Sequence, residues 1–136
     1  MKLNPINIDD TVYWKQIRGI DILFSDFRDS NKSDVIDLIR LQLDQINTKP
    51  NNMVYGVSLV KNTAYSSFIM AESKRNPLIT KSKNLITTVV GLNALQKVRL
   101  KFLSKLYPNT AKNFDTTHEA LDYILRVKQK SNFLKA

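Results

Sequence analysis

The sequence predicts a single α/β domain in which helices pack against a mixed, mostly parallel β-sheet. Three observations support this fold class. Strand-like runs alternate with helix-like stripes along most of the 136 residues, an order typical of α/β folds. The run 53–60 is almost continuously apolar, as expected of a strand buried on both faces of a parallel sheet. No repeat or second linker interrupts the chain, whose length suits one domain.

The segment 11–27 is expected to form two strands joined as a hairpin. Branched and aromatic residues, which favour strands, dominate both arms, and Arg18-Gly19 supplies a turn between them. After a polar break at 30–33, apolar residues recur every three or four positions and predict a helix. This helix should end before Pro50, because proline cannot continue it. Its apolar stripe is Val35, Ile36, Ile39, Leu43 and Ile46.

The middle of the chain should add two strands and a short helix. The runs 53–60 and 85–90 predict strands, and Gly91 closes the second of them. Between them, 65–75 predicts a short helix, and Asn76-Pro77 offers a start for another turn.

The C-terminal part predicts two helices with a short edge strand between them. The helix 92–107 has an apolar stripe that we expect to face the core, together with a basic stripe on the open side. The strand is expected at 111–115, and Thr116 and Glu119 form a capping box for the last helix. The apolar stripe is Leu95, Val98, Phe102 and Leu106, and the basic stripe is Lys97, Lys101 and Lys105.

The predicted element order is therefore ββαβαβαβα. It divides the chain into an N-terminal extension at 1–10, the α/β domain at 11–126 and a basic C-terminal tail at 127–136 that we expect to fray.

Composition excludes several kinds of chemistry. The chain has no cysteine, which excludes disulfides, cysteine nucleophiles and iron–sulfur clusters, and it has one histidine. No glycine-rich nucleotide loop is present, because its three glycines are isolated. From the sequence we expect no catalytic residues, no metal site and no cofactor.

Charge is distributed unevenly and suggests an anionic partner. The formal net charge is +9, and residues 61–136 hold 14 Lys and Arg against 4 Asp and Glu. Such an excess favours acidic proteins, phosphorylated ligands, nucleic acid or an anionic membrane surface, although it also fits a merely solvated surface. Neither a signal-peptide pattern nor a membrane-spanning run is visible, so the expected location is cytoplasmic.

Three segments carry a resemblance to a known family. The run from Thr87 to Lys97 resembles a strand–glycine–helix segment of the form VVG-x-x-G-LQK, with Ala94 at the second glycine. Residues 113–124 resemble the family's FDT-x-EEALDWL turn, and 24–27 resemble its second strand. These segments are similar to those of small bacterial STAS-like proteins, relatives of anti-sigma-factor antagonists that are grouped with the SEC14 lipid-binding superfamily. The resemblance covers about 11–126 and implies a mixed sheet with helices packed against it.

The resemblance also suggests candidate site residues. Anti-sigma-factor antagonists carry a phosphorylatable serine in an Asp-Ser-Ser-Gly turn; here Ser66 and Ser67 supply the paired serines, without the Asp and the Gly. They are candidates for a phosphoacceptor or ligand contact, or simply for a helix N-cap. The basic stripe of Lys97, Lys101 and Lys105 is the candidate partner-binding surface, or simply a solvated helix face.

Further residues are candidates for function and also have structural interpretations. Asp26 could be an acid beside a pocket, or a carboxylate that faces outward or caps a loop. His118 could carry a proton or bind a metal, or it could be a solvated residue of a first helical turn. The aromatic residues that could line a pocket or fill the core are Tyr13, Trp14, Tyr55 and Tyr65.

Three functional hypotheses follow from the sequence. The first is a non-enzymatic regulatory or protein-interaction module of the STAS-like type, with an acidic protein partner. The second is a protein that binds a small anionic ligand or a lipid head group, as the SEC14 relation implies. The third is a nucleic-acid binder, which charge alone suggests. A homodimer is a further expectation that the sequence leaves open.

Overall fold

The computed structural model describes residues 11–49, 53–63, 84–106 and 112–135. These residues form five strands and three helices. The strands are β1 (Val12–Ile17), β2 (Ile20–Asp26), β3 (Met53–Leu59), β4 (Asn84–Val90) and β5 (Lys112–Phe114). The helices are α2 (Lys32–Thr48), α4 (Ala94–Leu106) and α5 (Thr117–Lys135).

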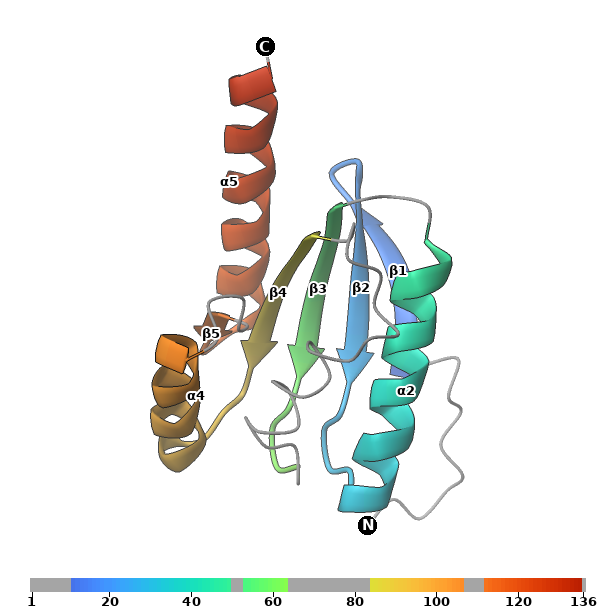
Figure 1. Ribbon diagram of the computed structural model, residues 1–136, viewed down its shortest axis with the longest axis vertical. Coiled ribbons are helices and arrows are strands. Elements are labelled where there is room, and N and C mark those ends of the chain that lie inside the picture. Colours follow the sequence, from blue (N-terminus) through green and yellow to red (C-terminus); the bar gives the residue numbers. More distant parts are fainter. Residues whose placement is uncertain (1–10, 50–52, 64–83, 107–111, 136) are drawn as a thin grey trace.

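The five strands form one mixed sheet in the order β1-β2-β3-β4-β5 (Figure 1). β1 and β2 are antiparallel, and the remaining neighbours are parallel. The α/β class and the mixed, mostly parallel sheet are therefore confirmed. The hairpin turn is also confirmed, because Arg18 and Gly19 both have positive φ angles, 49° and 81°. The helix expected at 65–75 lies outside the described residues.

Two apolar clusters lie on opposite faces of the sheet. Successive strand residues point to opposite faces, so Leu23 and Val54 join the α2 cluster, whereas Ile22 and Tyr55 join the α5 cluster. In Figure 1 the strands lie side by side between α2 and α5. β3 lies between β2 and β4 and contributes buried residues to both clusters, as its apolar run predicts.

Polar groups fix α2 against the sheet. The Asn31 side chain caps the helix by accepting a hydrogen bond from the Asp34 backbone N–H at 2.9 Å. Further along the helix, Gln42 donates to the hydroxyls of Ser25 and Ser58, at 3.0 and 3.3 Å. These serines are buried register partners on β2 and β3, so one glutamine side chain satisfies both.

The last helix differs from the sequence prediction at its end. The capping box forms, because the Glu119 backbone N–H donates to the Thr116 hydroxyl at 3.2 Å. The Glu119 carboxylate returns to the cap by accepting from the same hydroxyl at 3.0 Å. The expectation of a frayed tail after Arg126 is wrong, since α5 continues to Lys135. In Figure 1 its last turns extend beyond the strands.

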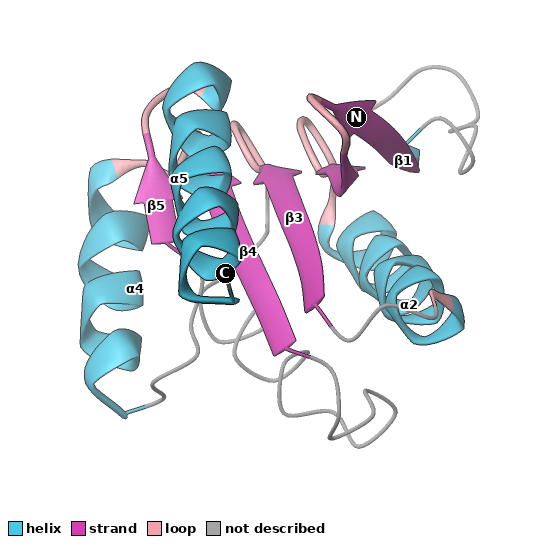
Figure 2. Ribbon diagram, turned by 90° about the horizontal axis from the view of Figure 1, so that it is seen from above, coloured by secondary structure: helices cyan, strands magenta, loops and turns pink. Residues whose placement is uncertain are grey.

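The predicted orientation of α4 is wrong. Leu95, Val98 and Phe102 were expected in the core, but 59%, 66% and 64% of their surfaces are exposed. Leu100 is buried instead, at 5% exposure, in the same cluster as α2. Each helical residue turns by about 100°, so Leu100 lies roughly opposite these three residues. α4 thus faces the sheet through Leu100 and lies beside β5 at one sheet edge (Figure 2).

The buried Tyr55 predicts a loss of stability in alkali. Burial of its ring raises the pKa of the Tyr55 phenol above the usual value of about 10. The folded state therefore holds this proton more tightly than the unfolded state. The resulting contribution to the free energy of unfolding is complete below about pH 10 and is lost as pH rises through the folded pKa. Tyr55→Phe should reduce the decline of unfolding free energy above about pH 10, as measured by urea titrations at several pH values. An identical decline in both proteins would contradict this assignment.

Candidate functional site

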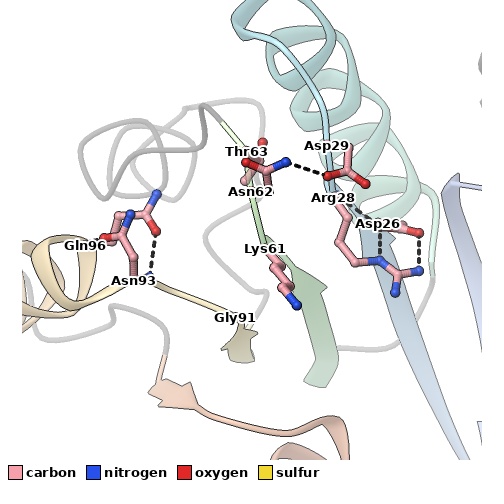
Figure 3. Close-up of a pocket in the computed structure, with 9 residues that line it drawn as sticks. All are labelled: Asp26, Arg28, Asp29, Lys61, Asn62, Thr63, Gly91, Asn93 and Gln96. Carbon is pink, nitrogen blue, oxygen red and sulfur yellow. Dashed lines mark hydrogen bonds and ion pairs between the residues drawn. The ribbon is translucent and has the colours of Figure 1, made fainter. Parts of the chain in front are cut away.

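A polar pocket opens at the carboxyl ends of β2, β3 and β4. Its volume is about 1120 Å³. The loops that follow these three neighbouring parallel strands converge at this end of the sheet. Figure 3 shows the side chains that surround it. They are Asp26, Arg28, Asp29, Lys61, Asn62, Thr63, Gly91, Asn93 and Gln96.

Backbone hydrogen bonds hold the three loops together. The ladder continues one residue past the strands, because the Phe27 N–H donates to the Leu59 carbonyl at 2.8 Å and the Val60 N–H donates to the Val90 carbonyl at 2.9 Å. The Asp29 N–H then donates to the Lys61 carbonyl at 3.3 Å. Phe27 and Val60 are also fully buried, so the base of the pocket is anchored in the core.

Unusual backbone conformations gather in these loops. Asp29 and Asn62 have φ angles of 59° and 54°, in the left-handed region that Asp and Asn tolerate best among residues with a side chain beyond Cα. The Asn62 amide donates to the Asp29 carboxylate at 2.9 Å, which links the two turns. Gly91 has a φ of 100° and lies close to Lys61. A Cβ atom added to Gly91 would be 3.0 Å from the backbone nitrogen of Lys61. Such conformations concentrate at functional sites.

Asp26 and Arg28 form a closed unit on one wall. The guanidinium donates to both carboxylate oxygens of Asp26, at 2.9 and 2.8 Å, and the Arg28 backbone N–H donates to the same carboxylate at 3.0 Å. The hydrogen bond to Asp26 raises the pKa of Arg28 above its ordinary value, against the opposing effect of partial burial. Asp26 is therefore a loop-capping carboxylate that also lines the pocket, which combines the two interpretations made from the sequence.

The opposite wall is the start of α4. The Asn93 side chain accepts from the Gln96 N–H at 2.8 Å, and the Gln96 side chain accepts from the Asn93 N–H at 2.9 Å. This reciprocal pair is the amide version of a capping box. In Figure 3 Lys61 lies between this turn and the Asp26–Arg28 unit. Among the residues that the structure describes, its ammonium group has no hydrogen-bond or ion-pair partner.

The lining therefore suits recognition of a polar ligand. It offers the Lys61 ammonium as a cation, carboxylate oxygens as acceptors, and side-chain amides and a hydroxyl that can donate or accept. Within the described parts of the chain, no group of three or more His, Cys, Asp or Glu residues is placed to hold a metal ion.

A second surface lies on the same helix. We call Leu95, Val98 and Phe102 the α4 ridge; they are spaced i, i+3 and i+7 and share one exposed face. Single exposed apolar side chains are common on protein surfaces. Several large ones grouped on one face are less common and often mark an interaction site. α4 carries four basic residues and no acidic one. Of these, Arg99, Lys101 and Lys105 are exposed around the ridge.

The structure separates the three lysines of the predicted basic stripe. Lys97 turns toward the β5 end, where its ammonium group pairs with Asp115 at 2.7 Å. Lys101 and Lys105 are exposed and flank the α4 ridge. The apolar residues beside them were expected to be buried and are exposed instead. The candidate serines, Ser66 and Ser67, lie outside the described residues.

Other residues named from the sequence take structural positions. His118 is a solvated residue of the first turn of α5, with 86% of its side chain exposed and Nε2 3.3 Å from an Asp122 oxygen. Trp14 donates its indole N–H to Gln45 at 3.1 Å, and Tyr13 stacks on Phe24 with ring centres 5.6 Å apart. Tyr55 is buried in the sheet. Tyr65 lies outside the described residues.

The ion pair between Lys97 and Asp115 should contribute little to stability. Both side chains are substantially exposed, 40% and 72%, so water and salt weaken their attraction. Asp115→Asn should lower the unfolding free energy by less than about 0.5 kcal/mol, as measured by urea unfolding. A loss several times larger would indicate that this contact fixes α4 against β5.

Sequence reasoning did not identify most of the pocket. Asp29, Lys61, Asn62, Asn93 and Gln96 were not singled out, although all of them follow predicted parallel strands. That position was the available signal, because the residues after adjacent parallel strands meet at one sheet edge.

Comparisons with known proteins add no assignment. No family model, curated protein or solved structure matches the chain significantly. In the described part of the chain, none of the helices has the length and apolar character needed to cross a membrane.

Proposed function

We propose that this chain is a non-catalytic regulatory module of the STAS-like type that binds a protein partner through α4. The observation that carries the proposal is the α4 ridge. Leu100 is buried in the core cluster, and three large apolar side chains remain exposed on the other side of the helix. Apolar residues that a folded helix already presents together cost less entropy to bind than residues that must first be ordered.

The resemblance to STAS-like proteins supports the regulatory part of the proposal. The strand–glycine–helix segment that carries this resemblance, residues 87–97, forms the end of β4, the Gly91 turn and the first turn of α4. The five-stranded mixed sheet with helices on both faces is compatible with the architecture that the resemblance implies.

The test compares ridge variants with a matched control. Val98→Ser/Phe102→Ser should abolish capture of the partner from host extract, and the purified partner should bind the wild-type chain but not this variant. Ile36→Ser, which changes an exposed apolar residue on α2, should bind normally. Equal binding by wild type and the ridge variant would refute the proposal, provided that thermal unfolding shows both to be folded.

A second candidate function is binding of a small anionic ligand in the pocket, and Lys61 favours it. Its ammonium group is unpaired among the described residues, whereas the Arg28 charge is already matched by Asp26. We expect native mass spectrometry of protein from its own host to show a bound anion that Lys61→Ala reduces by about tenfold, equivalent to about 1.4 kcal/mol. Retention of the anion by Lys61→Ala would place it elsewhere.

A further inference from the structure

We infer that the partner surface that covers the α4 ridge is an acidic amphipathic helix. This inference rests on the proposed function and adds the chemistry of the partner. The ridge residues Leu95, Val98 and Phe102 span seven positions, about 10 Å along the helix axis. That length corresponds to two turns of an opposing helix, and the spacing i, i+3 and i+7 is the pattern by which helices engage apolar partners.

The basic residues around the ridge favour a partner surface of negative charge. Lys101 and Lys105 lie on one flank of the ridge, and Arg99 lies on the other. The helix itself contains four basic residues and no acidic one. A partner with an apolar stripe and Glu or Asp on both sides would match the apolar and the charged positions together.

A second copy of this chain fits the ridge poorly. Two α4 helices facing each other would bring the exposed Arg99, Lys101 and Lys105 of both copies to one seam. Like charges that face each other across an interface oppose association. The surface that favours an acidic helix therefore disfavours self-association.

An anionic membrane is the other surface with suitable charge. Membrane binding by an amphipathic helix scales with the apolar area that enters the lipid. α4 offers only three large apolar side chains on this face, and Leu100 on its other side is buried in the core cluster. Three contacts suffice for the central cluster of a protein interface, in which a few residues dominate affinity.

The test uses the full chain and two synthetic helices of about 18 residues, roughly five turns. Both have the same leucine stripe; one carries glutamates on its flanks, and the other carries lysines. We expect amide chemical-shift changes in the isotope-labelled chain to centre on α4 when the glutamate peptide is added, and to weaken at high salt because screening shortens the range of charge interactions. The lysine peptide should cause no such changes.

Variants separate the contribution of the charged residues to peptide binding from that of the apolar residues. Arg99→Glu/Lys105→Glu should weaken binding of the glutamate peptide by about tenfold and gain binding of the lysine peptide, whereas Lys130→Glu, an exposed site on α5, should change neither. Val98→Ser/Phe102→Ser should abolish binding of the glutamate peptide, with Ile36→Ser unaffected.

Four results obtained with the purified chain would overturn the inference. They are equal binding of both peptides, changes centred away from α4, co-sedimentation with phosphatidylserine vesicles that the ridge variant abolishes, and α4 shifts that appear on concentrating the chain alone. Failure of the proposed function is a separate outcome, because it requires that the natural partner bind the ridge variant normally. A natural partner that needs the ridge but presents no acidic helix would overturn only the inference about its chemistry.

Discussion

Leu100→Ala should destabilise the domain by about 2–5 kcal/mol, whereas Phe102→Ala should cost less than about 0.5 kcal/mol. Leu100 is 5% exposed and packs in the cluster shared with α2, so its truncation leaves a cavity. Phe102 is 64% exposed, so its truncation removes few contacts. Urea unfolding of the two single variants measures both values.

This pair of variants decides how α4 faces the sheet. The sequence alone predicted the opposite order, with Phe102 in the core. If Phe102→Ala proved the more damaging change, the α4 ridge would be buried and the proposed partner surface would not exist.

Gly91→Ala should destabilise the domain by about 2–4 kcal/mol. Two causes combine at this position. The φ angle of 100° is strained for a residue with a side chain, and the new Cβ atom would lie 3.0–3.2 Å from backbone and side-chain atoms of Lys61. Because the opposing atoms include backbone, rotation of a side chain cannot relieve the contact. Urea unfolding again measures the effect.

Gly19 provides the matched control for this prediction. Its φ is also positive, 81°, but no atom lies within 4 Å of the added Cβ. Gly19→Ala should therefore show only the backbone cost, about 1–2 kcal/mol. Equal effects at the two sites would mean that the close approach of Gly91 to Lys61 contributes nothing to stability.

The strands could be predicted from the sequence because their apolar residues follow the pattern of burial in the sheet. The continuous apolar run of β3 reflects a strand with neighbours on both sides and helices over both faces. The turn at Arg18-Gly19 and the capping box at Thr116 are local features, set by residues within four positions of each other. Local chemistry of this kind does not depend on the rest of the fold.

The orientation of α4 could not be predicted because its sequence carries two overlapping apolar patterns. Leu95, Val98 and Phe102 form a regular stripe, and Leu100 lies on the other side. Periodicity ranks the longer stripe first, since most helices bury their more apolar face. In α4 that preference does not hold, because Leu100 takes the buried position and the longer stripe is exposed.

The pocket was not foreseen for a different reason. Its residues come from three loops that are brought together only by the register of the parallel strands. Asp29 and Asn62 are 33 positions apart, yet their side chains share a hydrogen bond. Nothing in either local sequence indicates this contact, so only the topology could have suggested it.

The most direct test of the central claim is site-specific photo-crosslinking in the host cell. A photoreactive residue is placed at Val98 on the α4 ridge or, as the control, at Ile36 on α2, both exposed apolar positions. The account predicts one defined protein adduct at position 98, absent at position 36 and lost when Phe102→Ser is added. Adducts of equal yield at both positions, or an adduct at 98 that Phe102→Ser leaves unchanged, would contradict it.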